Sequence, residues 1–194
     1  NTVVRIGADE ASRLMPFHSD ATITSVTIPD SVKCIGYGAF YKCTALENVV
    51  LGDGIEVIEA GVFRGCTKLA SIALSDNITT IGLNAFKDCP ELAVITIGDK
   101  VESIGTEAFL GCGKLATVNF KGTISQWNES LDGVAEGNDN LVDADIVYCY
   151  GMNCQHENAH VVNTVTCTED GIKTTTCLDC GNVTEETVNS LGHN

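Results

Sequence analysis

Proline, aromatic and basic residues are all scarce in this sequence. Of its 194 residues only 3 are proline and 6% are aromatic, whereas 19 are glycine. Many glycines with few prolines suit tight turns between ordered segments rather than a disordered polar chain. Because 44% of the residues are hydrophobic, we expect a sizeable core, and aliphatic side chains must fill most of it.

The shortage of basic residues gives the chain a net charge of −15, with 11 lysines and arginines against 26 acidic residues. So acidic a chain repels phosphate backbones and anionic membrane surfaces, which argues against nucleic acid as a partner. No apolar run approaches the roughly 20 residues that a membrane-spanning helix needs, so direct membrane insertion is not expected. A basic and then apolar leader is also absent, and we expect any secretion signal to have been removed or to lie outside this stretch.

A repeat of 23 residues dominates the chain. It is marked by Cys43, Cys66, Cys89 and Cys112, which are each 23 residues apart, and six apolar columns recur in step with them. The columns are Ile23, Leu46, Leu69, Leu92 and Leu115; Val26, Val49, Ile72, Ile95 and Val118; Ile28, Leu51, Leu74, Ile97 and Phe120; Val32, Ile55, Ile78, Val101 and Ile124; Ile35, Ile58, Ile81 and Ile104; and Phe40, Phe63, Phe86 and Phe109. A unit this small cannot bury its apolar side chains alone, so successive units must stack.

The period predicts a leucine-rich-repeat solenoid, whose units have 20–29 residues. Each L-x-x-V-x-I stretch predicts a short strand with alternate residues pointing inward, and the strands pair in a parallel sheet on one face. The V-x-x-I-G-x-x-A-F-x-x-C stretch returns the chain, and its Ala-led end predicts one helical turn. Gly36, Gly82 and Gly105 permit a bend after the inward isoleucine, although Glu59 takes that place in the second unit, so a positive φ is not obligatory there.

This signature resembles the BspA-like leucine-rich repeats of bacterial cell-surface proteins over residues 12–149. The resemblance implies an α/β repeat fold, a slightly curved right-handed solenoid. It also implies a secreted or cell-surface module for adhesion, which binds extracellular host or bacterial proteins or glycans and carries no catalytic residues in its repeats. A monomer is expected.

Degenerate units are expected to cap both ends of the solenoid, which spans residues 21–149. Residues 1–20 form the N-terminal capping coil, in which Phe17 falls on the phenylalanine column and Asp20 on the cysteine column. Near the other end, Trp127 takes the column of Ile104 and is expected to lie over the last coil as a lid. A closing strand is expected between Asn140 and Cys149.

Two polar columns have competing interpretations. The cysteine column is interpreted as buried free thiols, with disulfides or a string of metal sites as the alternative. The column of Asp30, Asp53, Asp76 and Asp99 is interpreted as turn capping, with Ca²⁺ binding as the alternative. Cys34 lies outside the columns and is interpreted as a small turn residue.

The outward strand positions are the candidate ligand-binding face, although a plain sheet face is an equal alternative because no aromatic or arginine anchor lies among them. They are Ser25, Thr27, Asn48, Val50, Ser71, Ala73, Val94, Thr96, Thr117 and Asn119. Enzyme activity is not expected, because no catalytic motif is present and His18 lies beside no repeated carboxylate. The alternatives to recognition are a passive stalk and an accessory module of a secreted enzyme.

Residues 153–194 have a different composition and predict a small β-rich module with too thin a core to fold unaided. Strands are expected at 164–166, 172–176 and 183–188. Cys177 and Cys180 form a Cys-x-x-Cys-Gly knuckle, which is typical of structural zinc sites with tetrahedral ligation. The remaining candidate ligands are Cys167, His156 and His193, which also match a small Cys/His repeat found beside such solenoids. Disulfides are the main alternative, and redox activity is the weakest one.

Overall fold

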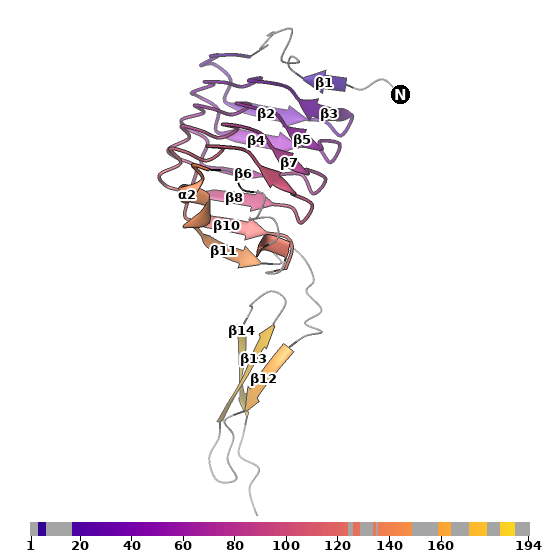
Figure 1. Ribbon diagram of the computed structural model, residues 1–194, viewed down its shortest axis with the longest axis vertical. Helices are drawn as coiled ribbons and strands as arrows, with labels where there is room; N and C mark the ends of the chain where they lie inside the picture. The colour runs from indigo at the N-terminus through magenta and orange to yellow at the C-terminus, as the bar shows by residue number, and fades with distance from the viewer. Residues whose placement is uncertain are drawn as a thin grey trace, which may run out of the picture.

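The repeats stack into a solenoid of parallel strands, in the order that the 23-residue period predicts (Figure 1). The computed structural model describes residues 17–123, 126–128, 134 and 136–147 in full, and the backbone alone of 4–6, 148, 159–163, 171–177 and 183–188. Within these residues no helix is long and apolar enough to cross a membrane.

The predicted strands line one face of the solenoid, which we call the strand face. The strands are β2 (Ser25–Ile28), β4 (Asn48–Leu51), β6 (Ser71–Ala73), β8 (Val94–Ile97), β10 (Thr117–Phe120) and β11 (Asp145–Tyr148). Equivalent residues are paired in register, for example Val26 with Val49 and Ile72 with Ile95. The face is not one continuous sheet, because β2 and β4 form a separate pair while β6, β8, β10 and β11 form a four-stranded sheet.

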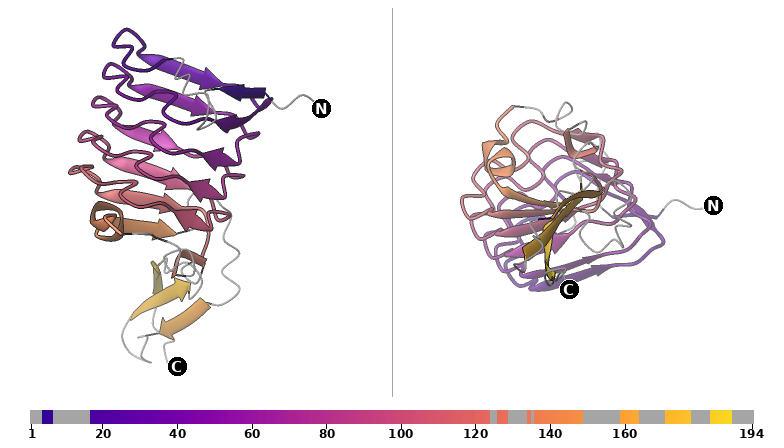
Figure 2. Two further views of the ribbon diagram at one scale, coloured as in Figure 1. Left: turned by 45° about the horizontal axis from the view of Figure 1, so that its top comes forward. Right: turned by 90° about the horizontal axis from the view of Figure 1, so that it is seen from below.

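A second parallel sheet, which the sequence analysis did not predict, runs along the return stretch. Its order is β1-β3-β5-β7-β9, with strands β1 (Val4–Ile6), β3 (Val32–Ile35), β5 (Val57–Ile58), β7 (Thr80–Ile81) and β9 (Ser103–Ile104). The left view of Figure 2 shows the coils stacked one below another, with the short strands of the second sheet along the right-hand side of the stack. The coils that contain β2 to β9 therefore contribute two strands each; the second sheet is continuous across them, whereas the strand face is broken between β4 and β6.

The A-F-x-x-C stretch forms hydrogen-bonded turns rather than the expected helical turn. Its N–H groups alternate between two partners: Ala39 N donates to Gly36 O within the coil, and Phe40 N donates to Val62 O of the next coil. Two residues in each of these turns have a left-handed backbone, which an α-helix cannot accommodate; the first turn has Gly38 at φ 56 and Lys42 at φ 55. The bend before the turn needs glycine for a different reason at Gly82, where a Cβ would lie 2.7 Å from Ala60 N while φ is not positive.

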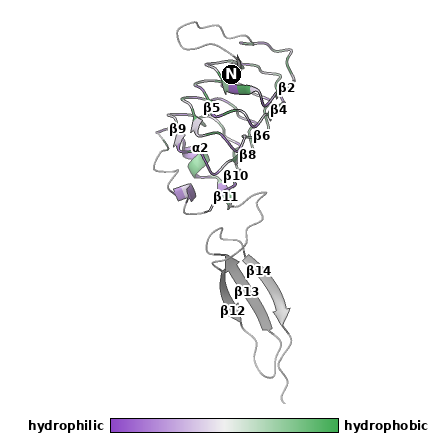
Figure 3. Cartoon of the chain, turned by 90° about the vertical axis from the view of Figure 1, so that its right-hand side faces the viewer, coloured by the Kyte–Doolittle hydropathy of each residue, from purple (hydrophilic) through white to green (hydrophobic). Residues whose placement is uncertain are grey.

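The apolar columns form one continuous core, as predicted. Leu46, Leu69 and Leu92 lie in one interior row and are fully buried. Figure 3 shows hydrophobic and hydrophilic residues alternating along the coils. The phenylalanines of successive coils stack with ring centroids 5.2 to 5.6 Å apart, an arrangement that adds to the energy of their burial.

Two residues that were expected to cover the ends of the core, Phe17 and Trp127, contact it, whereas most of the expected capping coil, residues 1–20, lies outside the described residues. Phe17 continues the aromatic column by stacking on Phe40 at 5.3 Å. At the other end Trp127 is buried and contacts Phe120 edge to face at 5.1 Å. The closing strand is shorter than predicted: it is β11 alone, and it follows a short helix, α2 (Asp139–Val142), whose Leu141 is fully buried.

The C-terminal segment contains a three-stranded antiparallel sheet in the order β12-β13-β14. Strands β13 (Gly171–Cys177) and β14 (Val183–Val188) agree with the prediction. The predicted strand at 164–166 lies outside the described residues. The first described strand of this sheet is β12 (Ala159–Asn163), which pairs antiparallel with β13 and places Asn163 opposite Lys173.

Candidate functional site

The outward side chains of the first three coils are exposed on the strand face. These residues are Ser25, Thr27, Asn48, Val50, Ser71 and Ala73. Val50 is the most apolar of them and has 58% of its surface exposed. This part of the predicted ligand-binding face is therefore open to solvent.

The same row is less exposed along β8 and β10. Thr96 and Asn119 retain only 7% and 9% of their surface, and Val94 and Thr117 are half-buried. The expectation that all ten outward positions form one accessible surface is therefore wrong for Thr96 and Asn119. Sequence alternation shows which way a strand residue points and contains no information on what lies over it.

A shallow hollow lies where the strand face is interrupted between β4 and β6, and we call it the strand-face hollow. Its volume is about 520 Å³, and it is lined by Glu47, Asn48, Lys68, Ala70, Ser71 and Glu91. Lys68 Nζ lies 3.1 Å from Glu47 Oε1 at its rim, so the hollow presents both signs of charge beside amide and hydroxyl groups. Such a surface can form hydrogen bonds and ion pairs with a ligand, but it offers no nucleophile paired with a base.

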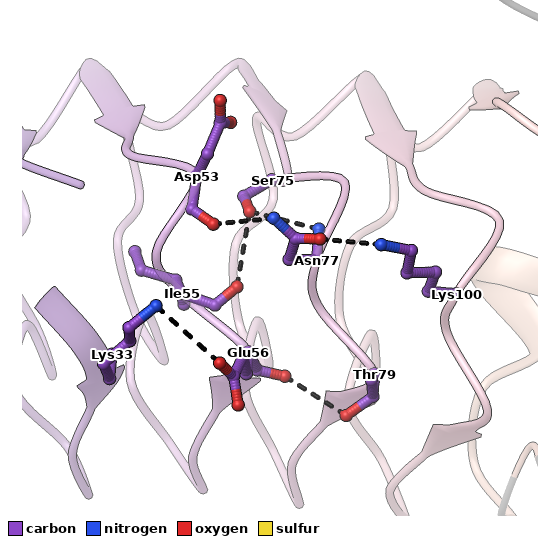
Figure 4. Close-up of polar contacts among 8 residues, drawn as sticks. All are labelled: Lys33, Asp53, Ile55, Glu56, Ser75, Asn77, Thr79 and Lys100. Atoms are coloured by element: carbon purple, nitrogen blue, oxygen red, sulfur yellow. Dashed lines mark hydrogen bonds and ion pairs between the residues drawn. The ribbon is translucent and has the colours of Figure 1, made fainter. Parts of the chain in front are cut away.

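The aspartate column lies on the turns that follow the strands of this face, and two of its carboxylates bond to another coil. Asp30 Oδ1 accepts a hydrogen bond from Asp53 N at 3.0 Å, and Asp76 Oδ1 lies 2.6 Å from Lys121 Nζ. Figure 4 shows the next residues of these turns joined in the same way: Asn77 Nδ2 donates to Asp53 O, and Lys100 Nζ donates to Asn77 Oδ1. The predicted capping role therefore holds for Asp30, although its carboxylate accepts from a backbone N–H of the neighbouring coil and not of its own turn. Among the described residues no cluster of three His, Cys, Asp or Glu side chains could hold a metal ion.

The cysteine column consists of buried free thiols, as predicted. Each Sγ donates to the carbonyl oxygen of the phenylalanine in the preceding coil, for example Cys66 to Phe40 at 3.3 Å and Cys112 to Phe86 at 3.2 Å. Burial raises the pKa of Cys66 to about 12, and it has the same effect on the pKa of Cys112. The thiols remain protonated and are poor nucleophiles at neutral pH.

Cys34 belongs to a strand rather than to a turn. It lies in β3 opposite Val57, and its Sγ donates to Glu59 Oε1 at 3.2 Å. The prediction failed because the second sheet, which contains this position, was not foreseen.

A second hollow, which sequence analysis missed, lies on the turns, and we call it the turn-face pocket. It is lined by His18, Tyr37, Gly38, Tyr41, Ala60, Gly61, Arg64, Leu83 and Asn84. His18 is not isolated in the cap, because its ring stacks on Tyr41 at 4.9 Å. The available signal was the column His18, Tyr41, Arg64, in which ring and cationic side chains recur at one position of successive coils.

The proposed zinc ligands are not placed by the structure. Cys167, Cys180, His156 and His193 lie outside the described residues, and only the backbone of Cys177 is described, at the end of β13. The zinc and disulfide interpretations therefore stay predictions.

Solved structures of three bacterial proteins have the same architecture. A leucine-rich cell surface protein from Faecalibacterium prausnitzii A2-165 is 39% identical, with a TM-score of 0.58 over 66% of this chain and 32% of that one. A leucine-rich repeat protein from T. pallidum is 32% identical, with a TM-score of 0.56 over 60% of this chain and 52% of that one. The pneumococcal vaccine antigen PcpA, at 20% identity and a TM-score of 0.53, shares the fold.

This chain thus spans about a third of the first of these proteins and about half of the second. No curated protein matches the sequence. A family model described as a BspA type leucine-rich repeat region matches residues 15–131 in six copies, which is more than half of the chain. Together with the stacked 23-residue coils, this match shows that the chain belongs to the BspA-type leucine-rich repeat family.

Proposed function

We propose that this chain is a non-enzymatic recognition module of a bacterial surface protein, which binds a host or bacterial surface protein or glycan through its strand face. The observation that carries the proposal is the strand-face hollow, which coincides with the break between β4 and β6 in the exposed part of that face. Family membership and the likeness to a leucine-rich cell surface protein support an adhesion role and an extracellular location.

The physical basis of recognition is a rigid surface with many weak contacts. The coils are joined by two sets of strands and by a continuous core, so the exposed side chains are held in a fixed arrangement. A preorganised surface loses little conformational entropy on binding, which favours affinity even where each contact is weak. Repetition of such modules along a longer protein adds avidity.

A passive spacer is the second candidate. It is favoured by the small size of the exposed side chains, since Ser25, Thr27, Ser71 and Ala73 offer none of the large anchors that dominate protein interfaces. A spacer needs the stacked core but does not need the hollow. The two functions therefore differ in what substitution at the hollow does.

The test is binding of the full chain to immobilised extracellular-matrix proteins, bacterial surface extracts and a glycan panel, measured by biolayer interferometry. Ser71→Arg places a long charged side chain in the strand-face hollow and is expected to weaken binding about tenfold. Ser31→Arg is the matched control, because Ser31 is an exposed serine of a turn and does not line the hollow.

Binding that is lost in Ser71→Arg and retained in Ser31→Arg supports recognition through the strand face. Absence of binding to every immobilised target would favour the spacer. If Ser71→Arg binds as tightly as Ser31→Arg, the recognition surface lies away from β4 and β6.

A further inference from the structure

The turn-face pocket has a floor without side chains. The floor is formed by Gly38 and Gly61, which occupy the same position in successive coils and have left-handed backbones with φ of 56 and 65. A Cβ built on Gly61 would meet no heavy atom within 4 Å, so the space above the floor is open. The next residue of this column, Asn84, has φ 55 and closes one end of the pocket.

One wall of the pocket is a fixed stack of ring and cationic side chains. Tyr41 has His18 stacked on it at 4.9 Å, and the guanidinium carbon of Arg64 lies 5.7 Å from its ring centroid. Arg64 Nε is also 3.6 Å from Asp88 Oδ2, which holds the guanidinium in place while its side chain stays 35% exposed. The wall therefore presents hydrogen-bond donors in a defined position.

Another part of the pocket lining is mainly apolar, and the lining also includes an unsatisfied acceptor. Tyr37, Ala60 and Leu83 form the apolar wall. Asn84 Oδ1 is buried and has no hydrogen-bond partner among the described residues, an arrangement that is unfavourable unless a donor is supplied. Asn84 is itself one of the residues that line the pocket.

These features fit a sugar ring better than a peptide. A pyranose offers hydroxyl groups at its edge, which donate to an amide oxygen and accept from a guanidinium, and C–H groups on its faces, which pack on aromatic and aliphatic side chains. The volume of about 330 Å³ is at the small end of the roughly 300–1,000 Å³ that ligand pockets occupy. The adjoining backbone N–H groups are already bonded between coils, with Gly38 to Ala60 O at 3.0 Å and Gly61 to Leu83 O at 2.9 Å, so a peptide strand has no N–H groups to pair with there.

We propose that the turn-face pocket binds one pyranose residue of a glycan, with Arg64 as donor, Asn84 as acceptor and the wall of Tyr37 and Leu83 against the sugar face. The pocket shares no residue with the strand-face hollow. Sugar binding here is therefore independent of recognition through the strand face, and Ser71→Arg is expected to leave it unchanged.

The experiment is saturation-transfer NMR of the full chain, followed by calorimetry, with glucose, galactose, mannose, fucose, N-acetylglucosamine, glucuronic acid and N-acetylneuraminic acid. Gly61→Asn fills the floor and suits the left-handed backbone, as Asn84 shows in the equivalent position. Gly113→Asn is the matched control, because Gly113 is exposed, has open space around it and lies outside the pocket. Asn84→Gly tolerates the left-handed backbone and removes the side-chain amide, including the acceptor, and circular dichroism checks that each variant is folded.

We expect at least one sugar to bind the wild type and Gly113→Asn equally, with affinity lowered about tenfold or more in Gly61→Asn and reduced in Asn84→Gly. Three results would overturn the proposal. The first is no saturation transfer to any sugar at millimolar concentration. The second is that Gly61→Asn binds the sugar as tightly as the wild type. The third is that short peptides bind in place of the sugars and that Gly61→Asn abolishes this peptide binding.

Discussion

The Sγ atom of Cys89 donates a hydrogen bond of 3.1 Å to the carbonyl oxygen of Phe63 in the preceding coil. The same oxygen accepts a bond from the backbone N–H of Cys66 within its own turn. One carbonyl thus links the end of a turn to the next coil, and Cys43, Cys66 and Cys112 each make the same thiol bond to the phenylalanine carbonyl of the preceding coil. The cysteine column is therefore a structural element of coil stacking.

Replacing a thiol in the middle of this column is expected to destabilise the solenoid. Cys89→Ala removes a fully buried sulfur and its hydrogen bond, and we expect a loss of about 2 kcal/mol in the free energy of unfolding, measured by urea denaturation. Cys34→Ala is the comparison, because Cys34 is only half-buried, and it is expected to cost below about 1 kcal/mol. Equal losses in the two variants would contradict this role of the column.

The buried thiols also predict a loss of stability in alkali. Burial raises the pKa of Cys66 from 9.0 to about 12, so above pH 9 the unfolded chain releases a proton that the folded chain keeps. The contribution of this thiol is fully present below pH 9 and is lost as the pH rises from 9 toward 12, by about 1.4 kcal/mol per pH unit. Urea denaturation from pH 8 to 11 should give a shallower decline for Cys66→Ala than for the wild type. Parallel declines would show that this thiol does not titrate as its burial requires.

Substitution of a phenylalanine in the stacked column should lower the free energy of unfolding most at the centre of the column. Phe86 is fully buried between Phe63 and Phe109, and Phe86→Ala is expected to cost about 3–5 kcal/mol. Phe17 stacks on one neighbour and keeps 37% of its surface exposed, so Phe17→Ala should cost markedly less. Thermal unfolding followed by circular dichroism measures both. A larger loss for Phe17→Ala would instead mean that the cap controls the stability of the whole array.

The C-terminal segment is expected to bind zinc. We predict that Cys177, Cys180 and two of Cys167, His156 and His193 hold one Zn²⁺ in a tetrahedral site. Elemental analysis of the chelator-washed protein, compared with a Cys177→Ser/Cys180→Ser double variant, measures the metal. A metal-free wild type whose cysteines in this segment cannot be titrated would establish disulfides instead.

The stacking of the coils could be predicted from the sequence because the same apolar residue types recur at each position. Leu46, Leu69 and Leu92 and the aromatic column are buried for that reason. The second sheet was missed because strands such as Val57–Ile58 have two residues, too few to show alternation. The turns were mistaken for helix because Gly38 and Gly61 are followed in the same column by Asn84 and Glu107, which hide a shared left-handed backbone.

The candidate sites were harder to predict than the core, because they depend on differences between coils. The strand-face hollow lies where Ala70 and Ser71 are small and β4 and β6 are not paired, and nothing in the repeat marks that break. The turn-face pocket depends on His18, Tyr41 and Arg64, three unlike residues in one column.

Ion pairs between neighbouring coils join residues about one period apart. Lys114 is ion-paired with Glu91, and Lys33 with Glu56, each across 23 positions. Gain or loss of one whole unit by recombination between repeats would therefore leave most coils with equivalent partners on both sides. A protein built in this way can change in length between strains without the need for a new core. Each added coil also presents a further set of surface residues that can vary.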